Sequence, residues 1–126
     1  MPLILDTSVA IHLRDGDAGV RDHVLGLDET PVLSIITQVE LEGGVTGPDA
    51  ALRRQRLDAM FAILEVLPFQ AADAAIYRAI ISSVGFSRRK TMDRLIAAQA
   101  ISIGAALATM NGDDFRDIPH LTLLEW

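Results

Sequence analysis

Five acidic residues stand where an apolar run of the chain ends or where a helical pattern begins. They are Asp6, Glu40, Asp93, Asp113 and Asp114. Short continuous apolar runs are typical of strands buried on both faces of a sheet. Because the carboxyl ends of parallel strands share one edge of the sheet, we expect these carboxylates to converge in one crevice.

Carboxylates crowded into one crevice repel one another unless a cation lies between them. Oxygen ligands with no neighbouring His or Cys suit Mg²⁺, or Mn²⁺ in its place, rather than Zn²⁺. Such an ion lowers the pKa of a water nucleophile, and a second ion about 3.5–4 Å away can stabilise a leaving oxygen. The pattern therefore predicts a site of one or two metal ions that is suited to phosphoryl chemistry.

Three of these acids also have a purely structural explanation. Asp6 fits the N-cap position of a helix. Glu40 lies three residues after Thr37, and the pair fits a capping box. Asp93 lies in the first turn of a helix that Thr91 would cap, where the helix dipole favours an acid. The combination of the acids at one edge favours a metal site over separate caps.

The composition predicts one acidic domain. The chain has 126 residues, half of them hydrophobic, no cysteine and a formal net charge of −6. We expect a single domain over residues 1–126, with no membrane span and no leader peptide. The lack of cysteine fits a reducing compartment, so we expect a cytoplasmic protein. The negative field opposes nucleic-acid binding unless metal ions and local basic patches overcome it.

Apolar periodicity predicts strands that alternate with helices. Strands are expected at residues 3–5, 32–36, 65–69, 105–109 and 121–124. Helical patterns cover residues 9–13, 18–27, 49–64, 71–84 and 91–103, and a short helix follows Thr37. Pro68 favours an edge position for the third strand. The expected fold class is α/β, in three α/β/α layers around a mainly parallel central sheet of four to five strands.

Two groups of basic residues interrupt the acidic sequence. One forms a loop just before Asp93, and the other lies on the polar side of the helix expected at residues 49–64. The members are Arg88, Arg89 and Lys90 in the loop, and Arg53, Arg54 and Arg56 in the helix. Such a cluster is usually a solvated face, and the alternative is contact with the phosphates of a nucleic acid.

Four short motifs, taken in order, resemble those of PIN domains. They are Leu5-Asp6-Thr7-Ser8-Val9, Ser34-x-x-Thr37-x-x-Glu40-Leu41, Asp93-Arg94-Leu95-Ile96-Ala97-Ala98 and Thr109-x-Asn111-x-x-Asp114-Phe115. Together they span nearly the whole chain, and more narrowly they resemble the VapC toxin ribonucleases of bacterial type II toxin–antitoxin pairs. The resemblance implies that Asp6, Glu40 and Asp93 bind Mg²⁺ and that Asp114 completes the site. Asn111 and Asp113 are nearby alternatives for this fourth position.

The resemblance also implies a PIN-like fold, cleavage of RNA by metal-activated water, a homodimer and a small VapB-like antitoxin that blocks the site. Thr7 and Ser8 would orient Asp6 or a phosphate, Thr109 would form hydrogen bonds within the site, and the basic residues would hold the RNA backbone. Two other functions compete with this one. One is a non-catalytic PIN-like module that only binds a partner, and the other is a metal-dependent phosphatase for small molecules, which would not need the basic loop.

Overall fold

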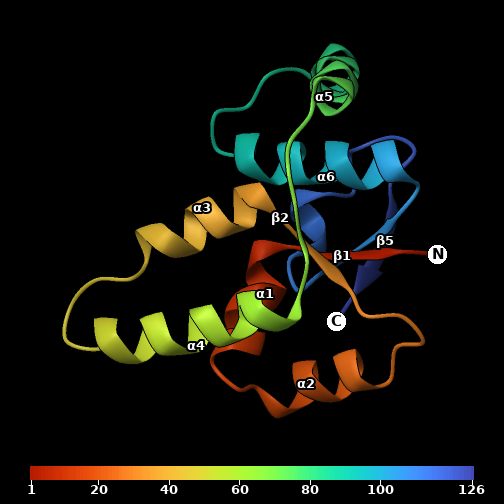
Figure 1. The fold of residues 1–126 in the computed structure, drawn as a ribbon. Coiled ribbons are helices and arrows are strands. Elements are labelled where there is room, and N and C mark those ends of the chain that lie inside the picture. The colour runs from red at the N-terminus through yellow and green to blue at the C-terminus, as the bar shows by residue number, and fades with distance from the viewer.

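Five short parallel strands form the centre of the computed structural model, which describes all 126 residues (Figure 1). In space their order is β3-β2-β1-β4-β5. The strands are β1 Leu3–Leu5, β2 Val32–Ser34, β3 Val66–Leu67, β4 Ala106–Thr109 and β5 Thr122–Glu125. Every neighbouring pair is parallel, which confirms the predicted sheet. Strand β3, directly before Pro68, lies at an edge as expected.

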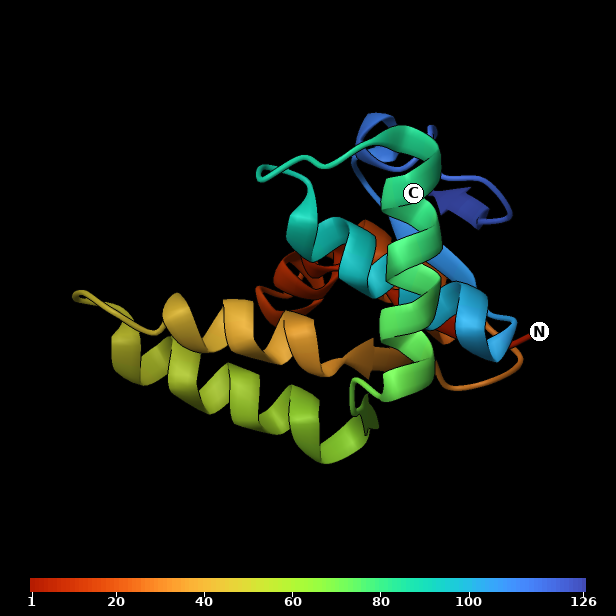
Figure 2. The same ribbon diagram turned by 90° about the horizontal axis from the view of Figure 1, so that it is seen from above.

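Six helices cover the two faces of this sheet. They are α1 Thr7–Arg14, α2 Ala18–Leu25, α3 Ile35–Gly43, α4 Ala50–Ile63, α5 Ala71–Val84 and α6 Thr91–Ile103, and a 3-10 turn, η1, covers Gly112–Asp114. Helices α5 and α6 lie on one face of the sheet and α1, α2 and α4 on the other, while α3 and α4 project from it side by side (Figures 1 and 2). The predicted three-layer α/β/α class is confirmed. None of the helices combines the length and the apolar character that crossing a bilayer requires.

Alternate side chains of the central strands divide the core into two clusters. Leu3 and Leu5 of β1 pack with residues of α1, α2 and α4. Ile4 points to the opposite face and packs with α5, α6, Leu107 of β4 and Phe115 after η1. Because both faces of β1 and β4 are covered, β1 is apolar at every position and β4 is apolar up to Thr109, its last residue. Their sequences are therefore continuous apolar runs rather than alternating ones.

Helix α3 begins three residues earlier than a capping box at Thr37 requires. Ser34, the last residue of β2, is the N-cap, and its Oγ accepts a 2.9 Å hydrogen bond from the amide of Ile36. Thr37 lies inside the helix and is fully buried. The predicted capping box of Thr37 and Glu40 is therefore wrong, and so is the predicted extension of the second strand to residue 36. Ser34 supplies the cap as soon as the strand ends, which leaves Glu40 without a capping role.

The N-cap predicted for Thr91 is also wrong. Lys90 occupies the N-cap position of α6, and no side chain caps that helix. The Thr91 hydroxyl instead donates a 2.9 Å hydrogen bond to the carbonyl of Ser87, the back-bonding that Thr commonly makes inside a helical turn. The amide of Lys90 donates to the Ser87 hydroxyl, so local hydrogen bonds fold the basic loop onto the start of α6.

A buried amide connects β2, α6 and the end of β3. Gln99 of α6 is 1% exposed, and its Oε1 accepts a hydrogen bond from the Ser34 hydroxyl. Its Nε2 donates to the carbonyls of Leu67 and Pro68 at 3.3 and 3.1 Å. Ser34 therefore both caps α3 and satisfies a polar group in the core.

Ser34→Ala should lower the free energy of unfolding by about 2 kcal/mol. The loss of a cap costs about 1 kcal/mol, and a buried carbonyl left without its donor costs about as much again. Urea unfolding measures the change. Ser82→Ala removes an exposed hydroxyl of α5 and is the control, with an expected change below about 0.5 kcal/mol. Equal effects of the two substitutions would contradict the double role of Ser34.

Candidate functional site

Asp6 lies at the carboxyl end of β1 and is the N-cap of α1. Its Oδ1 accepts hydrogen bonds from the Val9 amide at 2.9 Å and from the Ser8 hydroxyl at 2.6 Å. Its Oδ2 accepts one from Thr109 at the end of β4. The side chain is buried, and burial raises the pKa of this carboxyl although these hydrogen bonds oppose the rise. The predicted cap is confirmed, and the same carboxylate also bonds to the neighbouring strand.

Glu40 is connected to α1 rather than to the start of its own helix. Its Oε1 accepts a 2.7 Å hydrogen bond from the Thr7 hydroxyl. That hydroxyl also lies 3.0 Å from the hydroxyl of the buried Thr37. Because Thr7 directly follows Asp6, these two hydroxyls bring the acid of α3 to the edge of the sheet where β1 ends.

Asp93 carries the most perturbed carboxyl group of this edge. Burial, followed by the negative charges of Asp114, Asp6 and Glu40, raises the pKa of Asp93 to about 6, whereas the charge of Arg89 lowers it. A carboxylate perturbs another in this way only at close range. The four acids therefore form one electrostatic cluster, as expected from their positions in the sequence.

Only one of the two adjacent acids after β4 belongs to this cluster. Asp114 Oδ1 lies 3.2 Å from Nη1 of Arg89. Asp113 is 90% exposed and pairs with Arg116 instead. Asn111 donates its backbone amide to the hydroxyl at the end of β4. The geometry favours Asp114 as the fourth acid, and its role in binding a metal stays a prediction.

The donor set of the cluster consists of carboxylate oxygens surrounded by hydroxyl groups. No three His, Cys, Asp or Glu side chains are gathered into a group that could hold an ion as they stand. The chemistry nevertheless fits a hard divalent cation. The raised pKa of Asp93 comes first from burial and then from the charges of the neighbouring acids, and a bound cation would offset both effects. Asp6 is fixed by its hydrogen bonds, so the exposed Glu40 and the partly exposed Asp93 and Asp114 would have to move toward it.

The basic loop is anchored beside the acids by Arg94 and Asp117, two residues for which the sequence predicted no role. Arg94, 3% exposed, donates a 2.6 Å hydrogen bond to the carbonyl of Gly85 and a 3.3 Å one to Asp117. Lys90 Nζ lies 3.7 Å from the same Asp117 carboxylate. The loop is therefore held at both ends, with Arg89 directed toward the acids. Arg94 could have been noticed in the sequence, because it is a charged residue on the buried side of the most apolar helix.

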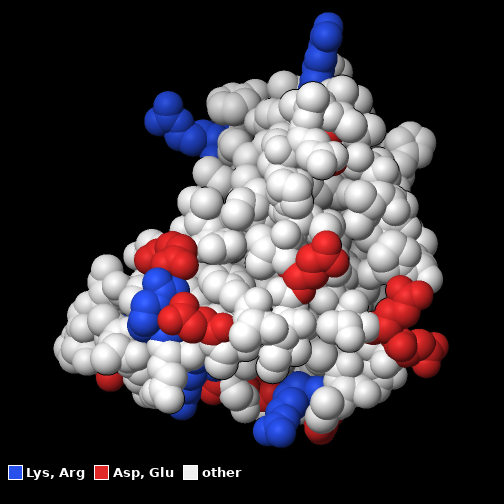
Figure 3. All heavy atoms as spheres, in the orientation of Figure 1, with Lys and Arg blue, Asp and Glu red and all other residues white.

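The arginines of α4 lie in a different environment. Arg54 forms ion pairs with Glu42 at 2.6 Å and Asp58 at 3.2 Å, and Arg53 donates to backbone carbonyls of the loop before α4. On the face of the molecule in Figure 3, the positive side chains are scattered and no continuous positive tract crosses the surface. Contact of Arg53 and Arg54 with RNA stays a prediction, as it does for Arg88, Arg89 and Lys90.

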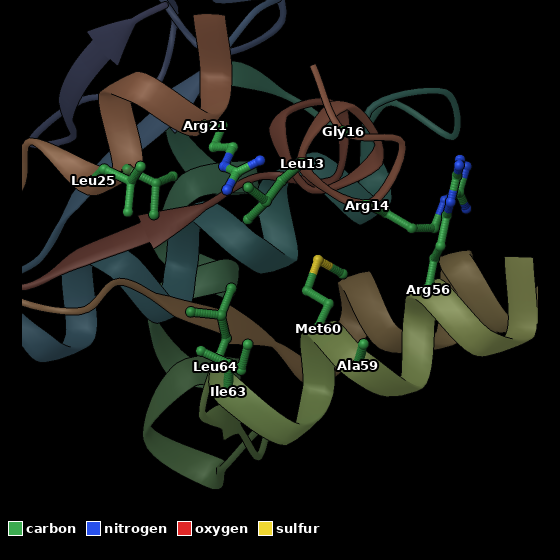
Figure 4. A pocket seen from close by; sticks show the side chains of 11 residues that line it. Leu13, Arg14, Gly16, Arg21, Leu25, Arg56, Ala59, Met60, Ile63 and Leu64 are labelled. Atoms are coloured by element: carbon green, nitrogen blue, oxygen red, sulfur yellow. The ribbon is translucent and has the colours of Figure 1, made fainter. Parts of the chain in front are cut away.

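An apolar groove of about 370 Å³ lies where the end of α1, the helix α2 and the helix α4 meet (Figure 4). Leu25 and Ile63 in its lining are 72% and 76% exposed. Three arginines stand around this groove: Arg14, Arg21 and Arg56. Arg14 pairs with the adjacent aspartate, whereas Arg21 and Arg56 form no ion pair. The groove therefore presents apolar surface together with two arginines that form no ion pair.

Comparison with known proteins identifies the family. The family model of the PIN domain matches residues 3–121, a span that includes all four acids of the cluster. The chain therefore belongs to the PIN domain family, as its motifs indicated.

Its relatives place it more narrowly. It is 32% identical to Ribonuclease VapC of Rickettsia bellii, over 98% of this chain and 96% of that protein. Ribonuclease VapC1 of Rickettsia felis is 31% identical with the same coverage. The solved VapBC2 of Rickettsia felis, bound to a DNA fragment from its promoter, superposes with a TM-score of 0.88 at 26% identity and covers 100% of this chain and 99% of that one. Within the PIN domain family, the chain is thus a member of the VapC ribonucleases.

Asp93→Asn should raise the free energy of unfolding of the metal-free protein at pH 7. The folded protein binds the proton of Asp93 more tightly than the unfolded chain does, because the pKa rises from 3.8 to about 6. Stability from this group therefore falls as the pH rises from about 4 to about 6 and is then constant. Discounted for the partial exposure of Asp93, the expected gain is about 1–2 kcal/mol.

Urea unfolding in EDTA between pH 4 and pH 8 measures this gain, which should shrink toward pH 4. Asp113→Asn is the control, because Asp113 is exposed and lies outside the cluster. Destabilisation by Asp93→Asn at pH 7 would show that repulsion among the acids is not the dominant effect there.

Proposed function

We propose that this chain is a Mg²⁺-dependent endoribonuclease and the toxin of a type II toxin–antitoxin pair. The convergence of Asp6, Glu40, Asp93 and Asp114 at the carboxyl edge of a PIN sheet carries the proposal, and the similarity to proteins named Ribonuclease VapC supports it. Mn²⁺ would serve in place of Mg²⁺, since both ions prefer oxygen ligands. When bound, the ion would lower the pKa of a water nucleophile and offset the negative charge of a phosphodiester.

The residues of the cluster would take different parts in this reaction. Asp6 would be the fixed ligand, because the Ser8, Val9 and Thr109 groups hold both of its carboxylate oxygens. Glu40, positioned by the Thr7 hydroxyl, would be a ligand or a proton acceptor at the edge of the site. Asp93 and Asp114 would complete the ligand set from α6 and η1.

The basic loop would hold the RNA backbone next to the acids. Arg88 is exposed and forms no ion pair, and Arg89 and Lys90 extend from the same anchored loop. In a chain with a net charge of −6, such a local cluster is what an RNA phosphate would contact. Arg53 and Arg54 would contribute less, because Arg54 is already neutralised by two carboxylates.

We also propose that a VapB-like antitoxin is the partner, and that the toxin pairs with a second copy of itself. Solved structures similar to this chain are VapBC complexes. The groove between α1, α2 and α4 would receive an antitoxin segment with an apolar face and acidic flanks. The exposed Leu25 and Ile63 of the groove would contact the apolar face of that segment. Arg21 and Arg56, which form no ion pair, would contact its acidic flanks.

Asp6→Asn and Glu40→Gln should each reduce RNA cleavage at least about tenfold. The melting temperature should stay nearly constant in Glu40→Gln, whereas Asp6→Asn replaces one buried acceptor oxygen by a donor and should lower it while the circular dichroism of the folded chain is kept. Glu40 has no capping role in this fold, so loss of a cap cannot explain a loss of activity. Cleavage of total RNA by the purified chain, with Mg²⁺ and with EDTA, measures the effect. Glu29→Gln, an exposed loop acid outside the cluster, is the control and should remain active.

The same assay separates the competing functions. Activity that persists in EDTA would reject the metal requirement. Hydrolysis of p-nitrophenyl phosphate without cleavage of RNA would identify a phosphatase for small molecules. Inactivity of the wild-type chain toward both substrates would favour a module that only binds a partner.

The double variant Arg21→Glu/Arg56→Glu should weaken antitoxin binding at least about tenfold, because it places negative charges against acidic flanks. The binding partner in this test is the cognate VapB-like antitoxin, to be sought as the product of a small open reading frame directly upstream of the gene, and calorimetry measures its affinity. Arg78→Glu, an exposed change on α5 on the opposite side of the sheet, should leave the affinity unchanged. Equal affinities for the double variant and the control would exclude the groove as the docking surface.

A further inference from the structure

The acid cluster contains a positive group of its own. Arg89 Nη1 lies 3.2 Å from Asp114 Oδ1, although the arginine side chain is 73% exposed. Its charge acts on Asp93 in the opposite direction to the charges of the three other acids. Arg89 therefore balances part of the negative charge that these carboxylates bring together.

The backbone that carries Arg89 is held in place, while its side chain is not. Arg94 binds the carbonyl of Gly85 at one end of the loop, and Lys90 lies within 3.7 Å of Asp117 at the other. These contacts keep Arg89 within reach of Asp114. The guanidinium itself is mostly in solvent, and an ion pair of this kind contributes only about 0–1 kcal/mol, so a competing cation can displace it.

Arg88 supplies a natural comparison. It carries the same charge one position earlier in the same anchored loop, but it has no carboxylate partner. A general electrostatic effect of the loop on the acids would act through both arginines. An effect of the contact itself would act through Arg89 alone.

We propose that Arg89 is a built-in counterion that occupies Asp114 in the metal-free protein and must leave when a divalent cation binds there. This inference rests on the metal site of the proposed function and adds a residue that controls its affinity. The arginine lowers the apparent affinity for the ion, because each binding event has to break the ion pair. In return, the metal-free cluster is less strained by repulsion.

Calorimetric or electron paramagnetic resonance titration of the full-length chain with Mn²⁺ at low ionic strength tests this inference. Arg89→Ala should tighten Mn²⁺ binding by about twofold to fivefold, which is the free energy of an exposed ion pair expressed as a ratio of affinities. Arg88→Ala should change the affinity much less. In an Asp114→Asn background, Arg89→Ala should have no further effect, because the carboxylate through which it acts is gone.

Each contrary result has a distinct meaning. Equal tightening by Arg88→Ala and Arg89→Ala would show that only the general charge of the loop acts, and it would overturn the counterion. An unchanged affinity in Arg89→Ala, with Mn²⁺ bound by the wild-type chain, would overturn the counterion and leave the metal site intact. No binding of Mn²⁺ to the wild-type chain or any variant would reject both the counterion and the proposed metal site.

Discussion

A single buried carboxylate, that of Asp6, joins three parts of this fold. It accepts the amide of Val9 at the start of α1, the hydroxyl of Ser8 in the same turn and the hydroxyl of Thr109 at the end of β4. A carboxyl group so deeply buried is tolerated because hydrogen bonds and the positive end of a helix compensate for lost hydration. The position of Asp6 fixes the edge of the sheet at which the other acids must meet.

The sheet and most helices could be predicted from the sequence because their signals are local. Strands covered on both faces are continuous apolar runs, and helices α5 and α6 end where Gly85 and Gly104 adopt positive φ. The caps of α3 and α6 could not be predicted in the same way. Several hydroxyls near each helix start are chemically able to cap it. At α3 the end of β2 selects Ser34, whereas at α6 the hydroxyls of Ser87 and Thr91 form hydrogen bonds within the loop and neither caps the helix.

The convergence of the acids was also predictable, because it follows from parallel topology. The motif resemblance favoured Asp114 over Asp113 as the fourth acid. The folded chain shows the physical difference, because Asp114 faces Arg89 and the other acids whereas Asp113 points into solvent beside Arg116. The pairs of Arg89 with Asp114 and of Arg94 with Asp117 span more than twenty positions. Ion pairs between distant residues have no periodicity or spacing in the sequence, so these contacts had to come from the structure.

Helix α1 sets the distance between the acids and the apolar groove. It begins directly after Asp6 and ends at Arg14 in the groove lining, and eight residues of helix rise about 12 Å. An extended chain covers that distance with about four residues. A ligand anchored in the groove would thus present its next few residues to the carboxylates at an effective concentration in about the millimolar range. A group on such a tether would therefore occupy the carboxylates even if its own affinity for them were weak.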